Sequence, residues 1–538
     1  MTPWAAGEGL SVLGIRERTG AAKPDMEKAM PDPGGNTVTR GRLLAKNTVL
    51  SLLGQFVPVL AAFLAIPAII RALGAPRFGV LSLAWMVVGY FGLFNMGVGR
   101  ATIKYVAENL ASGKTQLLPK LIWTSLSMLG LFGAFAGTLL VLCSALLVNR
   151  FLNVPSYLRP ETIKAFRLLA LAIPFDLAIG GLRGILAAQQ RFGTINAIKA
   201  PAGAASVIIP LLALSFTRSI YSIIAALVAA KVIVFFIYFY FCLKWTPGMR
   251  KFSLPDAALF KKLLGFGGWL TVSNIIGPLM DYMDRFIIGA MLTMSAVAYY
   301  CTPFDMLYKL LIIPGSLLAV VFPAFSATYA TDRDRFVRLY ERAIKYIIMA
   351  VAPILIVLVV MAKPLLAFWL GGEFASRSAA VLQVLAIGIF INATAQAPCT
   401  ALQGMGRPDL TAKLHVIELP LYLAAMRLLI PVMGIAGAAL AWTLRNAVDA
   451  CLLYWLADKS MPRPAGTKKS MFAQPVLVAV MSLSIFVQGR MHGFNGRFLY
   501  LLCASTAVCA FLWLFLFDMD EKRMIVDFMR ASARGLVA

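Results

Sequence analysis

The sequence predicts an all-α protein that crosses a lipid bilayer many times. Its mean hydropathy is +0.80 over 538 residues, with 60% of the residues apolar and only 14% charged. A single soluble core stops growing near about 250–300 residues, so this much apolar sequence requires lipid as its solvent. The apolar residues also fall in runs of about 20, the length with which an α-helix crosses roughly 30 Å of hydrocarbon.

About fourteen such runs, each bounded by polar or charged residues, follow one another along the chain. We expect membrane-spanning helices at 48–70, 78–98, 121–147, 168–187, 200–216, 220–243, 264–289, 297–324, 346–369, 379–398, 414–431, 434–457, 472–488 and 498–517. None of the connecting loops is long enough to hold a domain.

The two ends of the chain are basic and predict cytoplasmic tails. Residues 1–47 contain no short apolar core followed by a small-residue cleavage site, so we expect a disordered tail rather than a secretory signal. With both termini inside, the tails and the loops on their side carry about 33 of the 50 Lys and Arg residues. The distribution therefore predicts that both termini, including the tail 518–538, are cytoplasmic.

A cytoplasmic linker at 244–262 divides the first twelve predicted helices into two sets of six. It contains Pro247, Gly248 and Pro255, which disfavour a continuous helix. We expect an N-terminal lobe at 48–243, a C-terminal lobe at 263–457 and two additional helices at 458–517. Two such lobes are typical of secondary transporters, which bind substrate between them near the bilayer midplane.

Several functions are disfavoured by what the sequence lacks. It contains no GxxxxGK[ST], HExxH or GxSxG motif, and no CxxC among its seven Cys. Its two His, His415 and His492, have no companion at metal-ligand spacing. We therefore expect no cofactor, no metal and no enzymatic activity. The net charge of +26 follows from membrane topology, so we expect no nucleic-acid partner.

Charged residues inside the predicted helices are the strongest functional signal, because a charge at the bilayer centre is costly unless it faces protein or water. Three opposite-charge pairs are spaced i,i+4, so each pair shares one helix face and either fixes packing or takes part in ion coupling. These pairs are Asp281 with Arg285, Asp305 with Lys309, and Arg445 with Asp449.

Asp284 and Lys231 have no such local partner and indicate contacts across helices or a water-filled cavity. We predict a cationic cavity that suits a phosphate or diphosphate, because Lys and Arg donate charge-assisted hydrogen bonds to phosphate oxygens. Its predicted residues are Arg285, Lys309, Lys231 and, at the cytoplasmic edge, Arg100. Asp284 or Asp305 is a candidate for carrying a coupling proton.

Several short segments resemble the Wzx-type polysaccharide (O-antigen) flippases of the MATE-like MOP exporter superfamily, over about residues 40–460. The segments are Arg71-Ala-Leu-Gly74, Phe78-Gly79-Val80, Gly97-Val98-Gly99-Arg100, Lys104-Tyr105-Val106-Ala107-Glu108, Met283-Asp284-Arg285-Phe286-Ile287-Ile288-Gly289, Val297-Ala298-Tyr299-Tyr300 and Phe322-Pro323-Ala324-Phe325.

The resemblance implies a V-shaped, two-lobe fold and a substrate of undecaprenyl pyrophosphate carrying an oligosaccharide. It also implies export across a bacterial inner membrane for lipopolysaccharide synthesis, with Arg285 and Arg100 attracting the pyrophosphate. Besides this lipid and the bilayer, other glycan-assembly membrane proteins are candidate partners.

Three other functions stay open. A multidrug antiporter of the same superfamily would need an anionic or apolar cavity for its cationic drugs. A membrane glycan polymerase or ligase would need a sizeable periplasmic loop with catalytic residues. A scaffold for glycan synthesis would give no reason for so many charges within helices.

Overall fold

The computed structural model describes residues 37–111, 115–189, 191–246, 249–461, 468–490, 494–516 and 522. Met1–Leu50 and Ser51–Ala538 form separate units. Residues 1–36 of the predicted tail and most of the tail after 517 lie outside the described residues. The first helix begins at Thr37, so residues 37–47 of the predicted disordered tail are helical.

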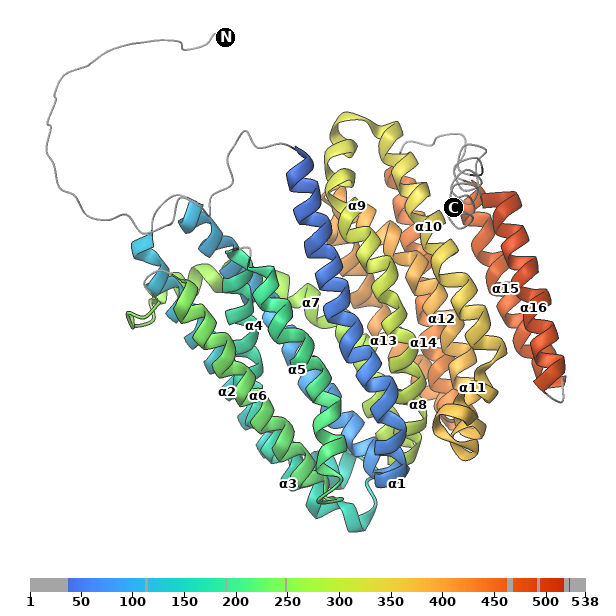
Figure 1. Cartoon of the computed structure of the whole chain (residues 1–538), viewed down its shortest axis with the longest axis horizontal. Helices are drawn as coiled ribbons and strands as arrows, with labels where there is room; N and C mark the ends of the chain where they lie inside the picture. The colour runs from blue at the N-terminus through green and yellow to red at the C-terminus, as the bar shows by residue number, and fades with distance from the viewer. Residues whose placement is uncertain are drawn as a thin grey trace, which may run out of the picture. The chain divides into compact units, whose positions relative to one another are not determined.

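All regular elements in the described part of the chain are helices, which confirms the predicted all-α class. They are α1 Thr37–Ala111, α2 Leu118–Leu146, α3 Arg159–Ala170, α4 Ala172–Ala188, α5 Phe192–Ala213, α6 Ile220–Trp245, α7 Ala257–Met291, α8 Met294–Tyr308, α9 Ile312–Thr331, α10 Arg333–Val360, α11 Ala362–Leu370, α12 Gly372–Gly404, α13 Pro408–Met433, α14 Ile435–Ser460, α15 Lys468–Arg490 and α16 Phe494–Phe511 (Figure 1).

The fourteen predicted spans all fall on these helices, but the helix boundaries differ from the prediction. The first two spans, 48–70 and 78–98, are two arms of α1, which bends at Gly74. Gly74 has a φ of +75°, a conformation that costs glycine little and other residues more. The two spans are therefore joined by a kink within one helix, where the prediction expected a loop.

Three further predicted spans each cover two helices. In each case a proline stands at the third position of the second helix: Pro174 in α4, Pro314 in α9 and Pro364 in α11. Proline lacks the backbone N–H that would continue the preceding helix, but this N–H has no intrahelical partner in a first turn. The prolines thus explain where these spans break.

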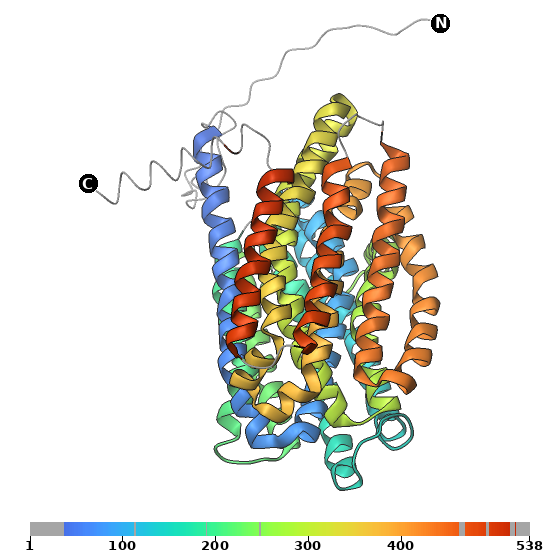
Figure 2. The same ribbon diagram turned by 90° about the vertical axis from the view of Figure 1, so that its right-hand side faces the viewer.

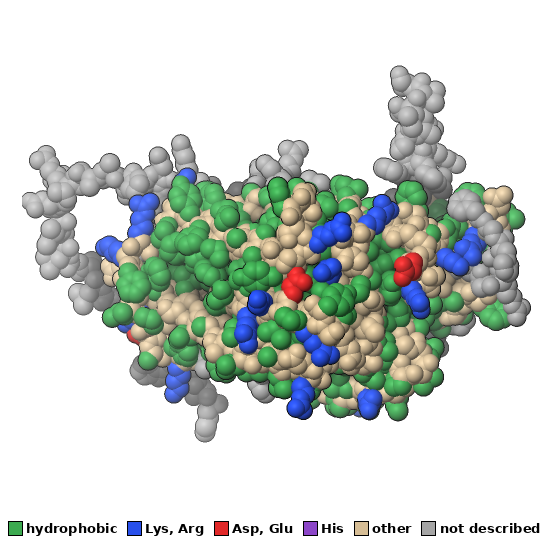
Figure 3. Space-filling view, turned by 90° about the horizontal axis from the view of Figure 1, so that it is seen from below, with side chains coloured by type: hydrophobic (Ala, Val, Ile, Leu, Met, Phe, Trp, Pro, Cys, Tyr) green, Lys and Arg blue, Asp and Glu red, His purple; other side chains and the backbone are tan. Residues whose placement is uncertain are grey.

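Ten segments in the described residues are long and apolar enough to cross a membrane, and Ala473–Val487 in α15 is a shorter apolar helix. Large apolar side chains such as Phe135, Phe216 and Phe368 are exposed. Hydrophobic side chains also cover much of the face shown in Figure 3, with Lys and Arg scattered among them. Since soluble proteins rarely expose so much apolar surface, the chain is a multi-pass membrane protein. The number fourteen stays a prediction.

The helices pack side by side in the unit from Ser51 onward (Figures 1 and 2). Helix α6 contacts α3, α4 and α5, while α12 contacts α8 to α11 and α14. Helix α13 packs between α14 and α7, and α15 and α16 contact α10. These contacts set the neighbours of each charged residue discussed below.

Small residues allow some of these helices to approach closely, as the spacing of Gly133 and Gly137 predicts. A Cβ on Gly133 would lie 2.4 Å from the Cα of Pro174, and one on Gly137 would lie 2.8 Å from the carbonyl oxygen of Ala170. A Cβ on Gly79 of α1 would lie 1.9 Å from the carbonyl oxygen of Met294 at the start of α8. A larger residue at any of these positions would push two backbones apart.

The described part of the linker is fastened to α2. Asp256 caps the N-terminus of α7, accepting hydrogen bonds from the backbone N–H of Ala258 and Leu259. It also forms an ion pair of 2.5 Å with Lys120 of α2. The hydrogen bond from Lys120 and those from the backbone lower the pKa of the Asp256 carboxyl. Helix α7 therefore begins at Ala257, inside the predicted linker 244–262.

Candidate anion-binding site

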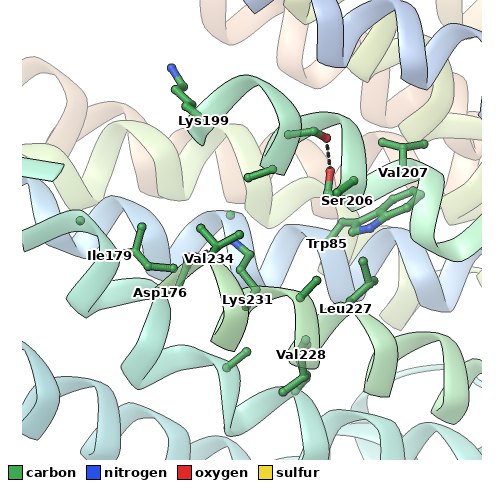
Figure 4. A pocket seen from close by; sticks show the side chains of 18 of the residues that line it. Trp85, Asp176, Ile179, Lys199, Ser206, Val207, Leu227, Val228, Lys231 and Val234 are labelled. Atoms are coloured by element: carbon green, nitrogen blue, oxygen red, sulfur yellow. Dashed lines mark hydrogen bonds and ion pairs between the residues drawn. The ribbon is translucent and has the colours of Figure 1, made fainter. Parts of the chain in front are cut away.

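A pocket of about 520 Å³ lies among α1, α4, α5 and α6. Trp85 of α1 and Tyr238 of α6 contribute aromatic side chains to its lining, and most of the other lining side chains are aliphatic. Its charged residues are Asp176 and Arg183 on α4, Lys199 on α5 and Lys231 on α6. Figure 4 labels Asp176, Lys199 and Lys231. Three cations and one carboxylate leave the lining with a net charge of +2.

The sequence explains why these side chains meet. Asp176 and Arg183 are seven residues apart, so they lie two turns apart on the same face of α4. Lys231 lies near the middle of α6, which packs directly on α4 and α5. Many of the other lining residues are small, among them Gly180, Ala202 and Ala205, so their side chains take up little of the space.

Lys231 and Asp176 pair across two helices. The Lys231 Nζ lies 2.5 Å from the Asp176 Oδ1, and the two side chains are 35% and 11% exposed. This contact agrees with the expectation that Lys231, which has no local partner, reaches another helix. Because the pair neutralises itself, Lys231 alone does not account for the charge of the pocket.

Arg183 and Lys199 supply the uncompensated positive charge. Both side chains are exposed, and neither forms an ion pair or hydrogen bond with any of the described residues. They lie close enough for Arg183 to repel Lys199. In Figure 4, Lys199 lies at the edge of the pocket, apart from Lys231 and Asp176. Two neighbouring cations without a carboxylate between them favour an anionic ligand.

The structure places the predicted cavity residues Arg285 and Lys309 elsewhere, since neither lines this pocket. Arg285 of α7 is only 4% exposed and forms an ion pair with Asp305 of α8. Lys309 begins the short 3₁₀ turn Lys309–Leu311 between α8 and α9. Arg100 lies on α1, but its side chain is outside the described residues. Substrate contact by these three residues stays a prediction.

Asp284 is fully buried next to Arg285. It accepts hydrogen bonds of 2.6 Å from the Tyr300 hydroxyl and 2.7 Å from the backbone N–H of Arg285. The ion pair with Arg285 gives Asp305 a partner on another helix, in addition to its i,i+4 neighbour Lys309. The side chain of Asp281, the predicted partner of Arg285, lies outside the described residues. This cluster joins α7 to α8 and has the features of a packing element.

The third predicted pair belongs to a different cluster. Arg445 donates a 3.0 Å hydrogen bond to the Oδ1 of Asn446, and Asp449 lies 3.7 Å from the His415 Nε2 of α13. Glu418 of α13 completes this group. Asp449 is distant from His415 in the sequence and reaches it only through the packing of α13 on α14. The spacing of His415 and Glu418, three residues apart on one helix, was the available signal.

Comparisons with known proteins agree with a membrane transporter fold. The solved structure of a lipid II flippase, MurJ, has a TM-score of 0.67 at 13% identity and covers 87% of this chain and 98% of that one. An inward-facing multidrug resistance MATE family transporter of the MOP superfamily also has a TM-score of 0.67, at 14% identity, covering 76% of this chain and 94% of that one. At such low identity these matches show the fold alone.

Sequence relatives identify the family. A Shigella flexneri protein described as "Putative O-antigen transporter" is 33% identical over 415 residues, which cover 77% of this chain and 97% of that protein. The profile of the family described as "Polysaccharide biosynthesis protein" matches residues 68–379, more than half of the chain. The chain therefore belongs to this polysaccharide biosynthesis protein family.

Proposed function

We propose that this protein is a flippase that moves an undecaprenyl-diphosphate-linked oligosaccharide across the bacterial inner membrane for surface polysaccharide synthesis. The observation that carries the proposal is the pocket among α1, α4, α5 and α6, in which Arg183 and Lys199 have no carboxylate partner among the described residues. The name of the Shigella flexneri relative, which refers to O-antigen transport, supports the same substrate class.

The chemistry of the pocket suits a diphosphate. A diphosphate carries several negative charges, and Arg and Lys bind phosphate oxygens through short charge-assisted hydrogen bonds. The pocket lining is mostly aliphatic, so a phosphate bound there is attracted more strongly than it would be in bulk water. The pocket volume of about 520 Å³ lies in the usual range for small-ligand sites and would hold the diphosphate with part of the first sugars.

Transport would proceed by alternating access between the predicted lobes 48–243 and 263–457, with both termini in the cytoplasm. The polyprenyl chain would remain in lipid while the charged headgroup crosses inside the protein. An ion gradient would drive this movement, because the sequence has no ATP-binding motif. The protein would act as a transporter rather than an enzyme, with the lipid-linked glycan as its principal partner.

A multidrug antiporter is the second candidate, because the fold is shared with MATE transporters. Their name refers to drug resistance, and cationic drugs would be repelled by a pocket of net charge +2. The fold match is too remote in sequence to carry the drug function over. The charge of the pocket therefore favours the glycan lipid.

Reconstituted transport tests the proposal. Proteoliposomes that contain the protein and a fluorescent undecaprenyl-diphosphate oligosaccharide should move the lipid between leaflets under an imposed proton or sodium gradient. Accessibility of the sugar to an added glycosidase reports the movement, with protein-free liposomes as the control. The proposal fails if the lipid stays in its leaflet under every gradient while a cationic dye is exported.

A further inference from the structure

A second buried cluster of titratable groups lies outside the anion pocket, between α13 and α14. Side-chain nitrogen or oxygen atoms of His415, Glu418 and Asp449 all lie within 4.8 Å of one another. Glu418 and Asp449 are 2% and 6% exposed, and His415 is partly buried. Two carboxyl groups so close together cannot both ionise cheaply in a buried environment.

Glu418 lacks the donors that a buried carboxylate needs. Neither of its carboxylate oxygens accepts a hydrogen bond from the described residues, although both oxygens are inaccessible to solvent. Another acid, Asp449, places a carboxylate oxygen within 4.8 Å of one of the Glu418 oxygens. A buried carboxylate without hydrogen-bond donors and next to a second acid is costly to ionise, whereas the protonated carboxyl is neutral. The geometry therefore points to a proton between Glu418 and Asp449.

The charge of the surroundings favours a single positive charge at this position. Arg445 faces the same cluster, so two ionised carboxylates and one guanidinium would leave one net negative charge. A proton neutralises this charge, whereas a divalent cation would leave an excess positive charge. His415, whose Nε2 lies 3.7 Å from Asp449, supplies an imidazole that exchanges protons near neutral pH.

A cavity of about 140 Å³ adjoins the cluster and gives the proton a path. His415, Arg445 and Asp449 line it together with neutral groups from α12 and α7. Tyr422 on α13 and Cys399 on α12 are the other titratable groups on these elements near the cluster. On α7 and α8, Asp284, Arg285, Tyr300 and Asp305 contact one another.

We propose that Glu418 and Asp449 share one exchangeable proton, which enters and leaves through His415, and that this site couples proton movement to transport. The coupling half of this inference rests on the proposed flippase function, but the binding of the proton does not. Loss of the proton would leave two like charges within 4.8 Å and favour separation of α13 from α14. Because α13 also packs on α7, the charge state would bias the packing of the C-terminal helices.

Infrared difference spectroscopy on the purified full chain in lipid nanodiscs tests proton binding directly, without any substrate. The native protein should show a protonated-carboxyl band that Glu418→Gln and Asp449→Asn each remove. Asp409→Asn, which changes an exposed acid on the same helix, should leave the band in place. The site is disproved if the band persists in both cluster variants while their melting temperatures match that of the native protein.

Two further arms separate the remaining possibilities. If the band is absent at constant pH only when NaCl is present, and sodium raises the melting temperature of the native protein but not of Glu418→Gln, sodium is the ligand and the proton assignment is wrong. In proteoliposomes, a pH gradient should accelerate native transport and lose this effect in Glu418→Gln. If the native protein moves no glycan lipid but retains the band, the flippase function fails and the proton site stands.

Discussion

The double variant Arg183→Gln and Lys199→Gln is expected to transport the diphosphate-linked lipid at least about 100-fold more slowly than the native protein at low substrate concentration. A hydrogen bond to a charged group contributes about 1.5–3 kcal/mol, and each 1.4 kcal/mol corresponds to about tenfold in affinity. Two such contacts are lost, and no carboxylate is left unpaired, since in the part of the chain that the structure describes neither residue has one as a partner. Initial rates in proteoliposomes of equal protein content measure the effect.

The matched control is Lys363→Gln with Arg427→Gln. Lys363 of α11 and Arg427 of α13 are exposed cations that do not line the pocket. The control therefore removes two positive charges from the chain, as the pocket variant does, but from outside the pocket. Its transport rate should stay close to that of the native protein. Equal losses in the two double variants would show that overall charge, rather than the pocket, governs transport.

Arg285→Met is expected to destabilise the protein by about 3 kcal/mol. Removing one member of a buried ion pair costs about 3–5 kcal/mol, because its partner is left uncompensated. The lower end applies because the Asp305 side chain is 40% exposed and remains partly solvated. Titration of the folded protein with a denaturing detergent in mixed micelles measures the change in the free energy of unfolding.

Adding Asp305→Asn to Arg285→Met should restore much of this stability, since the neutral amide needs no counter-charge. Recovery in the double variant identifies Arg285 as a residue that joins α7 to α8. Full stability of Arg285→Met together with lost transport would instead favour the substrate contact that the sequence resemblance implies for Arg285.

The fold was largely predictable because the length of an apolar run is enough to identify a membrane-spanning helix. The positions of α2, α6 and α14 follow from hydropathy and flanking charge. What hydropathy does not show is where a helix bends or breaks inside an apolar run. Gly74 bends α1 through its backbone conformation, and Pro314 ends the preceding segment through a missing N–H, neither of which changes the apolar character of the run.

The candidate site was only partly predictable. Lys231 stood out because an unbalanced charge in the middle of a membrane helix is costly, and the structure gives it a partner in Asp176. Lys199 lies near the start of its helix, where Lys and Arg are common topology signals, so its position alone does not single it out. Its nearness to Arg183 depends on how α4 and α5 pack, which one sequence does not specify.

The most direct test of the anion pocket is to map where the diphosphate headgroup binds. An undecaprenyl-diphosphate probe with a photoreactive group on its first sugar would be crosslinked to the purified protein in nanodiscs, and the labelled peptides identified by mass spectrometry. Labelling of α4, α5 and α6 that unlabelled lipid suppresses, and that the Arg183→Gln and Lys199→Gln variant loses, is the predicted result. Specific labelling confined to α7 and α8 around Arg285 would contradict the assignment and place the headgroup at the other cationic cluster.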